Sequence, residues 1–364
     1  MMWADTVALS VVLALAVAAA WLIPAAGMRR LMPILEERGK KALNYRGVEV
    51  PVVLGTVWVL WALGLSALTA IVMAVVWFTY SLAAGSYGYA GAALAGISAP
   101  VSLAVPLVLG SAFLGMIDDL YGDPSARGFR GHLKEMRAGR LTTGGLKMLG
   151  IGLLAMSAAS YVTLIGIPLS AEPTVPAAAE RLAQFVCATL VIALSANFVN
   201  LTDLRPGRAL KTYGIMAVFG IGVIKVATLY SDFLGLWTPG GPEAWGQFAW
   251  GVAATFLQLS TLTVLAFGPL FAVWRFDLGE RGMLGDAGAN AAGAFAGLLL
   301  VMASPLWLLV VLTVVLLALN LVSERVSFSS VIERVRFLRW LDGLGRTPVE
   351  RSADEATSDA GEDE

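Results

Sequence analysis

The hydrophobic residues of this chain are gathered into long runs that short polar segments separate. A helix that crosses a lipid bilayer needs about 20 mostly apolar residues. Runs that meet or approach this length predict nine helices, at roughly 6–27, 51–72, 92–117, 148–170, 183–201, 212–231, 248–273, 287–303 and 305–322. The pattern therefore predicts an all-α, polytopic membrane helix bundle of nine to ten transmembrane helices.

Two places in this pattern decide the number of helices. Ser304 and Pro305 divide the last two short runs, and we expect a tight reversal there because proline cannot continue a helix. Residues 51–80 are too many for one upright helix. They form either one tilted helix with an interfacial end or a pair of helices, and the side on which every later loop lies depends on the choice.

The positive charges favour the single helix. All but two of the 25 Lys and Arg residues lie in five clusters, at 29–46, 127–147, 205–211, 275–281 and 325–351. With nine helices these clusters fall in alternate loops, and the opposite loops contain only Arg181. Because Lys and Arg concentrate in cytoplasmic loops, the N-terminus is predicted to lie outside. The expected location is the cell inner (plasma) membrane, as a multi-pass protein.

Composition narrows the class of protein and its chemistry. The chain is 58% hydrophobic and only 14% charged, against about 25% charged in a soluble domain, which excludes a soluble globular protein. Its one cysteine excludes an internal disulfide, and its one histidine excludes a zinc site built on a histidine cluster. Carboxylate oxygens with Mg²⁺, or with Mn²⁺, remain available. Residues 1–348 are expected to form the membrane domain and residues 349–364 a disordered acidic tail.

Acidic residues stand at the predicted cytoplasmic ends of three helices. Asp118 and Asp119 end the third helix, Asp203 follows the fifth, and Asp286 precedes the eighth. Carboxylates so close to hydrocarbon are costly, and each lies beside a basic loop, so we expect a divalent cation and phosphates to meet there. Asp118, Asp119 and Asp286 are predicted to converge on one Mg²⁺-sized site. Glycines around Asp286 are expected to let backbone N–H groups approach a phosphate.

Each of these motifs also has an ordinary structural interpretation. An aspartate pair at a helix end can cap a helix or form a loop ion pair, and a Gly-Asp-Ala-Gly sequence can be a plain turn. Asn197 and Asn200 can join two helices by hydrogen bonds. The occurrence of the whole set on one side of the membrane is what favours a functional site.

Several motifs, in order along residues 42–335, resemble those of a known family. They are NYRGVEVP, IDDLYGD, LTTGGLKML, NFVNLTD, LGDAGANAAG and SERVSFSSVIERV. The chain resembles the polyprenyl-phosphate N-acetylhexosamine-1-phosphate transferases, the group that contains the bacterial phospho-MurNAc-pentapeptide translocase and the GlcNAc-1-phosphate transferases. The resemblance implies Mg²⁺-dependent attack of a polyprenyl phosphate on the β-phosphate of a UDP-sugar, in the synthesis of a cell-envelope glycopolymer.

The resemblance also implies roles for individual residues. Asp286 would be a Mg²⁺ ligand, and Asp118 and Asp119 would lie at the metal–phosphate centre, Asp119 as a further ligand. Lys147 would contact phosphate. The nucleotide side of the cleft would be formed by Asn197, Asn200 and Asp203. The expected partners are the lipid phosphate, the UDP-sugar and the membrane, without nucleic acid, and a homodimer remains an open option.

The chain departs from the family pattern in three ways. After Asp203 the second acid of the usual motif is replaced by Pro206, and Arg205, Arg208 and Lys211 appear nearby. The late histidine-rich loop is absent from the sequence, and nine helices are predicted where ten are usual. Arg205 and Arg208 are either orienting charges of a cytoplasmic loop or cations that bind extra phosphate or carboxylate on the substrate.

These departures leave two further alternatives open. The first is a catalytically altered or inactive family member that binds lipid phosphate or scaffolds envelope enzymes. The second is a secondary transporter, which would need ionisable residues near the membrane midplane, where only Lys225 is a candidate.

Overall fold

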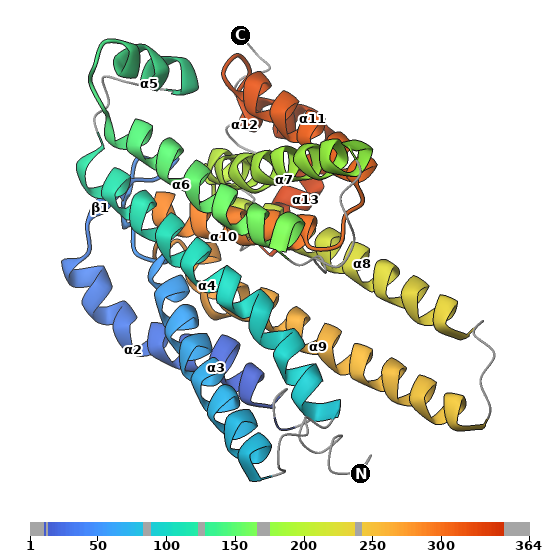
Figure 1. The fold of residues 1–364 in the computed structure, drawn as a ribbon. Coiled ribbons are helices and arrows are strands. Elements are labelled where there is room, and N and C mark those ends of the chain that lie inside the picture. The colour runs from blue at the N-terminus through green and yellow to red at the C-terminus, as the bar shows by residue number, and fades with distance from the viewer. Residues whose placement is uncertain are drawn as a thin grey trace.

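The structure, a computed structural model, describes residues 11, 14–82, 89–122, 128–165, 175–236 and 242–345. Within this part of the chain, eight helices are long and apolar enough to cross a membrane, and a shorter apolar helix accompanies them. The prediction of an all-α membrane bundle is therefore confirmed (Figure 1). The acidic tail at 349–364 and residues 6–10 of the first predicted helix lie outside the described residues.

The observed helices follow the predicted runs in order. The long helices are α2 (Ile23–Arg38, entered through the π-helical turn η1, Ala18–Leu22), α3 (Thr56–Leu82), α4 (Tyr89–Tyr121), α6 (Thr143–Ser160, continued by the π-helical turn η2, Tyr161–Ile165), α7 (Val175–Thr202), α8 (Arg208–Leu236), α9 (Pro242–Leu278), α10 (Gly285–Val301) and α11 (Leu306–Ser323). The short helices are α5 (Gly128–Arg137), α12 (Phe328–Arg334) and α13 (Arg336–Gly343).

The two places that decided the predicted number of helices have the expected form. Most of the 51–80 run forms one continuous helix, α3, which begins at Thr56 rather than at Pro51. Pro305 lies at the N-cap of α11, four residues after the end of α10 at Val301. The first helix was predicted to end near residue 27, and that boundary is wrong. It continues to Arg38 because charged residues do not break a helix once its surface is solvated, and most of residues 29–38 are at least partly exposed.

A small β-hairpin follows α2 and was not predicted. Strands β1 (Lys41–Leu43) and β2 (Glu49–Pro51) pair antiparallel, and Gly47 between them has a φ of 73°, in the left-handed region. The Asn44 side chain accepts hydrogen bonds from the backbone of Arg46 and Val48, at 2.9 and 3.0 Å, and so shapes the turn. The hairpin in turn binds the loop before α10, since Met283 donates to the Pro51 carbonyl at 2.9 Å.

Helix α10 lies at the centre of the bundle, packed mainly against α7 and α4 and then α8 (Figure 1). Every residue from Gly288 to Val301 is buried. Small residues allow this, because a Cβ added at Gly293 would lie 2.4 Å from the Ser195 carbonyl oxygen, and one added at Gly297 would lie 2.7 Å from the Cα of Ile192. Such close backbone contact places α10 in the middle of the bundle.

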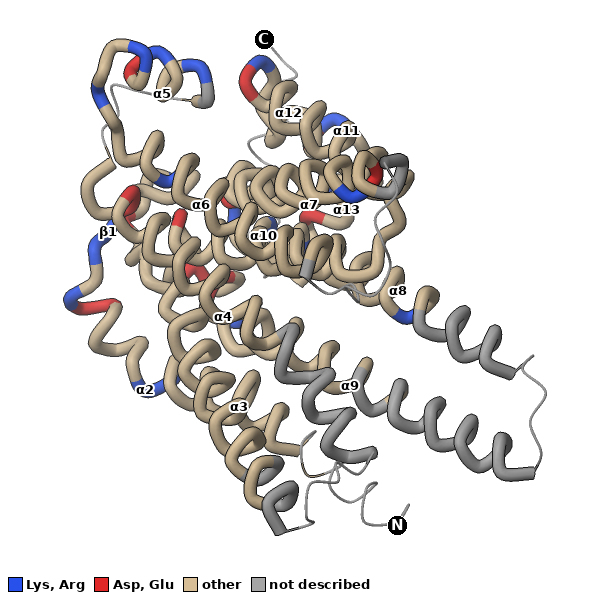
Figure 2. Tube along the Cα trace, in the orientation of Figure 1, with Lys and Arg blue, Asp and Glu red and all other residues tan. Residues whose placement is uncertain are grey.

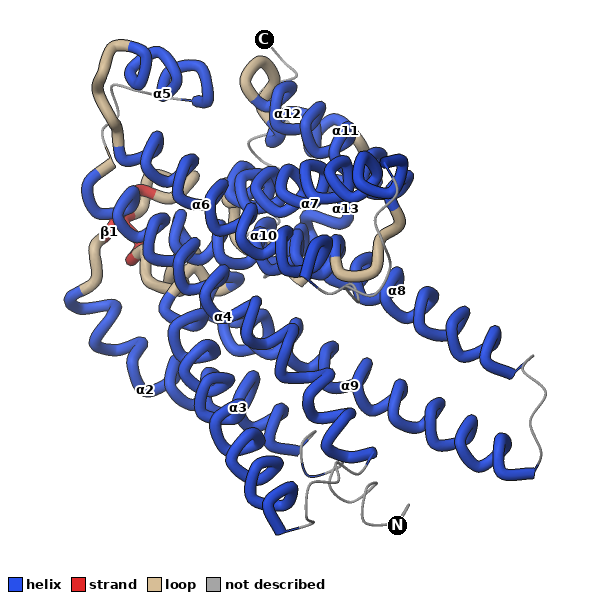
Figure 3. Tube along the Cα trace, in the orientation of Figure 1, coloured by secondary structure: helices blue, strands red, loops and turns tan. Residues whose placement is uncertain are grey.

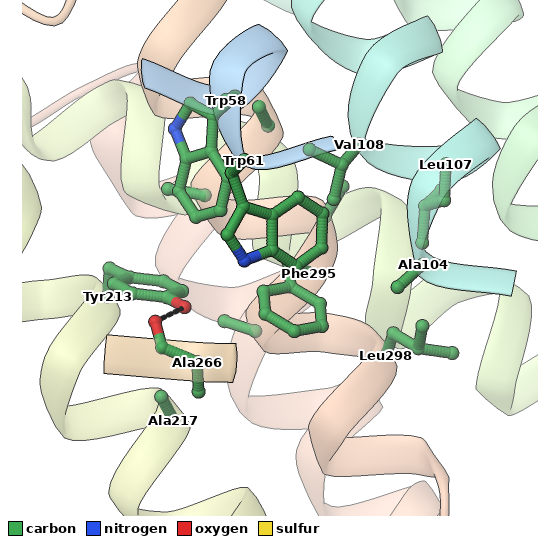
Figure 4. Packing of buried hydrophobic residues seen from close by; sticks show 14 of the residues in the cluster. Trp58, Trp61, Ala104, Leu107, Val108, Tyr213, Ala217, Ala266, Phe295 and Leu298 are labelled. Carbon is green, nitrogen blue, oxygen red and sulfur yellow. Dashed lines mark hydrogen bonds between the residues drawn. The ribbon is translucent and has the colours of Figure 1, made fainter. Parts of the chain in front are cut away.

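A group of aromatic side chains joins α10 to α3, α8 and α9 (Figure 4). The Trp58 ring lies edge-on to Trp61 and to Tyr213, with centroids 5.7 Å apart in each case, and Trp61 packs on Phe295 at 5.1 Å. Two polar atoms of this group donate to carbonyls of α9. Trp61 bonds to Leu265 at 2.9 Å and Tyr213 to Ala266 at 2.6 Å. The buried polar groups are thereby satisfied and α9 is held in register.

Charged residues of the described helices gather at one end of the bundle, the end that carries β1, α5 and α12 (Figure 2). The hairpin lies at this end as well (Figure 3). Glu180 and Arg181, near the start of α7, and Lys225 of α8 are exceptions. The Lys225 side chain is exposed, as a lysine extending toward a lipid headgroup would be.

Candidate active site

Three charged side chains from three helices meet at the charged end of the bundle. The Lys147 ammonium donates to Asp118 Oδ2 at 2.6 Å and also to Asp286 Oδ2. Asp118 lies near the end of α4, Lys147 near the start of α6, and Asp286 in the first turn of α10. We call Asp118, Lys147 and Asp286 the ion cluster. Its side chains are only 14 to 28% exposed, so their mutual attraction is weakly screened.

Local sequence explains how these helices bring the cluster together. Thr142 caps α6 by accepting from the Gly145 N–H at 3.1 Å, which leaves Thr143 and Lys147 on one face, four residues apart. Thr143 also donates to Asp118 at 2.6 Å. Between α4 and α10, a Cβ added at Gly115 would lie 2.3 Å from the Asp286 carbonyl oxygen. The absence of a side chain at this one position lets the two helices touch.

Asp119 lies beside the cluster but has a different role. Its carboxylate oxygens accept the backbone N–H groups of Asp286 and Ala287, each at 3.0 Å. Asp118, Asp119 and Asp286 thus lie close together, and their convergence on a Mg²⁺ site stays a prediction. Asp119 caps α10 from another helix, with one N–H on each oxygen, and its assignment as a metal ligand stays a prediction.

Asp203 completes the cap of α10. The Gly285 N–H donates to its carboxylate, and burial, followed by the nearby carboxylates of Asp277 and Asp286, raises the pKa of Asp203 well above its ordinary value. The expectation that glycines around Asp286 expose N–H groups to a phosphate is therefore wrong for the first turn of α10. Its N–H groups at 285, 286 and 287 already bind two aspartates of the chain itself.

A pocket of about 180 Å³ opens next to Asp203. We call it the acidic pocket. It lies between the β-hairpin, the loop after α7 and the loop before α10, and its polar lining includes Asn44, Tyr45, Asp203, Arg205, Asp277 and Glu280. Arg205 lies over the Tyr45 ring, 5.3 Å from its centroid, and pairs with Glu333. The pocket thus combines acceptor oxygens, an aromatic ring and a guanidinium.

Two acids of the acidic pocket were missed by the sequence reasoning. Asp277 is 4% exposed and accepts the Gly207 N–H at 2.7 Å. Glu280 has a φ of 51° and accepts from Asn44 at 2.9 Å. The signal that identified Asp118 and Asp203, an acid at the predicted cytoplasmic end of an apolar run, applies equally to Asp277 and would have found it.

The other residues predicted to bind substrate lie in different places, and only some of them line the acidic pocket. Arg205 lines the pocket. Asn197 instead donates to Asn320 of α11 at 2.6 Å, which is the helix-joining interpretation. Asn200 is half-buried, and its side chain makes no hydrogen bond within the described part of the chain.

Arg208 does not face the pocket, and its predicted substrate role is corrected here. Its guanidinium makes two bonds to the Asp342 carboxylate, at 3.0 and 2.8 Å, and a third to Ser329 at 2.9 Å. Lys211 donates to the Asp342 carbonyl. Neither the orienting-charge interpretation nor the substrate interpretation anticipated that these cations hold α13 against the start of α8.

The ion cluster has the donor atoms that Mg²⁺ prefers, although it is small. No group of three or more His, Cys, Asp or Glu side chains among the described residues is arranged to hold a metal ion. Mg²⁺ commonly takes only one or two carboxylates, with water and substrate phosphates completing its shell. The Asp118 and Asp286 carboxylates both accept from the Lys147 ammonium, so they supply such a pair.

No protein-family model matches this sequence, and no curated protein matches it. An assignment of activity therefore depends on the geometry of the ion cluster and the acidic pocket, together with the motif resemblance.

Proposed function

We propose that this protein is a membrane phosphoglycosyl transferase that moves a sugar-1-phosphate from a UDP-sugar to a polyprenyl phosphate at the cytoplasmic face of the inner membrane. The observation that carries the proposal is the meeting of Asp118 and Asp286 on one ammonium, from helices distant in sequence. The resemblance to the polyprenyl-phosphate N-acetylhexosamine-1-phosphate transferases involves the motifs that supply these residues. On this proposal the pathway is synthesis of a cell-envelope glycopolymer.

Two anions must be brought together in this reaction, and the ion cluster is suited to that task. Asp118 and Asp286 would hold Mg²⁺, which supplies charge neutralisation and an anchor for phosphate oxygens when bound. The Lys147 ammonium, fixed between two helices, provides a cation for phosphate oxygens. Because the cluster lies at the end of apolar helices, a lipid phosphate can reach it while its prenyl chain stays in the membrane.

The bond changes of the transfer are simple. An oxygen of the lipid phosphate attacks the β-phosphorus of the UDP-sugar, and the bond from that phosphorus to the oxygen bridging the two phosphates breaks. The bridging oxygen leaves with UMP, and polyprenyl-diphospho-sugar forms. Charge spreads over the phosphoryl oxygens in the transition state, so positioned cations and in-line alignment supply the rate enhancement.

The acidic pocket suits the uncharged part of the donor. Carboxylates such as Asp203 and Glu280 accept hydrogen bonds from sugar hydroxyls or a base N–H, and they repel phosphate. The volume of about 180 Å³ is below the range of about 300–1,000 Å³ usual for whole ligands, so one ring of the donor would occupy it. Asp277 accepts a hydrogen bond from the Gly207 N–H. Its carboxylate therefore lies beside the loop in which Pro206 stands where the family usually has a second acid.

A second function has one observation in its favour. Lys147 and the α10 amides already make hydrogen bonds to Asp118, Asp119 and Asp286 without any ligand. A family member that binds lipid phosphate or scaffolds envelope enzymes, without catalysis, would tolerate carboxylates that are occupied in this way.

The two functions are separated by an assay of the purified protein in detergent. Undecaprenyl phosphate, Mg²⁺ and a panel of UDP-sugars are supplied, and UMP release is measured. We expect release with at least one donor, and a loss of about 100-fold or more in Asp286→Asn and in Asp118→Asn, the scale of removing one electrostatic group from a preorganised site. Glu36→Gln is the matched control, because Glu36 pairs with Arg281 at the surface, outside the cluster.

Wild-type turnover in Asp286→Asn would reject the role of the cluster. Binding of the lipid phosphate without UMP release from any donor would favour the non-catalytic alternative.

A further inference from the structure

The segment from Glu324 to Gly345, which contains α12 and α13, lies after the last membrane helix and carries an unusual distribution of charge. We call it the C-terminal segment. Its acids each pair with a cation of another part of the chain: Glu324 with Arg130, Glu333 with Arg205 and Asp342 with Arg208. The acids thus attach the segment to the bundle.

The arginines of the C-terminal segment are left without such partners. The side chains of Arg325, Arg334, Arg336 and Arg339 are exposed and make no ion pair or hydrogen bond within the described residues. Pairing the acids inward leaves a net positive outer surface. The positive charge of this surface favours an anionic partner.

Helix α13 shows which kind of anionic partner fits. Leu338, Leu341 and Asp342 face the protein, and Asp342 is 8% exposed. On the opposite face, Phe337 and Trp340 are 64% and 59% exposed, and their rings stack with centroids 5.9 Å apart. Arg336 and Arg339 flank them on the same outward face. A face that is half aromatic and half cationic is the pattern of a helix lying in a membrane interface.

The depth of α13 agrees with this pattern. Asp342 bonds Arg208 and Lys211, which lie in the first turn of α8. A Cβ added at Gly345 would meet Leu278, the last residue of α9, at 3.0 Å. Both are ends of candidate membrane spans. The exposed Trp340 therefore lies at the level at which tryptophans concentrate in membrane proteins.

We propose that the C-terminal segment is a binding surface for anionic phospholipids, with Phe337 and Trp340 in the interface and the four arginines on headgroup phosphates. Each arginine near an anionic surface strengthens binding by about fivefold. The acidic tail, residues 349–364, is the competing occupant, but it offers charge without the apolar side chains that would cover Phe337 and Trp340. This surface does not depend on the proposed transferase activity.

The test uses the full chain in lipid nanodiscs. Leu344 is replaced by cysteine in a Cys187→Ala background and labelled with an environment-sensitive fluorophore, and quenching by spin-labelled lipid tails is measured. Discs contain phosphatidylcholine alone or with phosphatidylglycerol. We expect quenching to rise with phosphatidylglycerol and to fall with added salt. Arg336→Gln with Arg339→Gln should raise the phosphatidylglycerol needed for half-maximal quenching about tenfold or more.

The matched control removes the same charge elsewhere. Arg29 and Arg30 are exposed in the middle of α2, away from the C-terminal segment, so Arg29→Gln with Arg30→Gln should leave the quenching unchanged. In Phe337→Ser with Trp340→Ser, we expect salt-sensitive binding to persist with shallower quenching. Equal quenching of the wild type and the Arg336/Arg339 variant would overturn the proposal. Quenching that appears only after removal of residues 349–364 would overturn it in favour of the acidic tail.

Discussion

Lys147 shows how much a single residue controls at the ion cluster. Its ammonium is bonded to carboxylates of two helices, and all three side chains are mostly shielded from water. Removing the cation would leave two carboxylates in direct contact, which forces protonation of one of them or separation of the helices.

Lys147→Ala is therefore expected to make stability dependent on Mg²⁺. The loss of a partner from a buried ionic group costs about 3–5 kcal/mol, and a divalent cation on Asp118 and Asp286 would recover much of it. The measurement is thermal unfolding in detergent with and without MgCl₂. Arg140→Ala is the control, because Arg140 pairs with Glu135 while 71% exposed, and it should change little. Identical unfolding of Lys147→Ala in both conditions would contradict the assignment of a Mg²⁺ site.

Arg208 is expected to act on stability rather than on substrate affinity. Its guanidinium is bidentate on Asp342 and the residue is 3% exposed, so Arg208→Ala leaves a buried carboxylate unpaired and should cost about 3–5 kcal/mol. Arg208→Met with Asp342→Leu should restore most of this loss. The exposed pair formed by Arg281 and Glu36 provides the comparison, with a cost of about 1 kcal/mol or less in Arg281→Ala. The unfolding free energy in detergent measures all three variants, and a cost in Arg208→Ala as small as that in Arg281→Ala would refute the structural role.

At the scale of elements, the N-terminus of α10 is where α4, the loop after α7 and the β-hairpin are joined. Helices α4 and α7 deliver Asp119 and Asp203 to its first N–H groups, and the loop before it is bonded to the β-hairpin. A helix N-terminus carries a partial positive charge, so two carboxylates there both satisfy donors and offset the dipole. The cap holds Asp286 in position for the ion cluster.

Asp119→Ala is expected to loosen this junction selectively. Two N–H groups lose their acceptors, and the cost should be at least about 2 kcal/mol. Asp119→Asn keeps one acceptor oxygen and should lose less. Hydrogen exchange of the amides at 285–290 is the measurement, with faster exchange expected there than in α11. Glu37→Ala, an exposed acid, is the control, and unchanged exchange in Asp119→Ala would exclude the capping role.

At the scale of the whole molecule, the bundle has one charged end and long apolar helices that lead away from it. This arrangement agrees with the distribution of Lys and Arg along the chain, which predicts that the charged end is cytoplasmic. Orientation follows from insertion into the membrane and remains a prediction.

Cysteine accessibility tests the orientation directly. In a Cys187→Ala background, Arg137→Cys should react with a membrane-impermeant thiol reagent only from the cytoplasmic side. Ser86→Cys, outside the described residues and in a segment that the sequence predicts on the opposite side, should react only from that side. Labelling of both positions from one side would contradict the nine-helix topology, because α4, which lies between them, would then fail to cross the membrane.

The sequence by itself determined the order and the approximate limits of the long apolar helices. These follow from the length of apolar runs and from the insertion preference of basic loops, both of which act on a segment without reference to its neighbours. Ser304–Pro305 shows this independence, since a proline stops a helix wherever the helix lies. Asp118, Asp203 and Asp286 could likewise be identified as acids at helix ends from their own segments alone.

Only the tertiary structure decided which groups these acids meet. Asp118 and Asp119 are adjacent in sequence and at the end of one helix, yet Asp118 faces Lys147 and Asp119 faces the α10 amides. Arg205 and Arg208 separate in the same way, one to the acidic pocket and the other to Asp342. Successive residues of a helix or tight turn point about 100° apart, so the packing of neighbouring helices, and not the motif, assigns each side chain its partner.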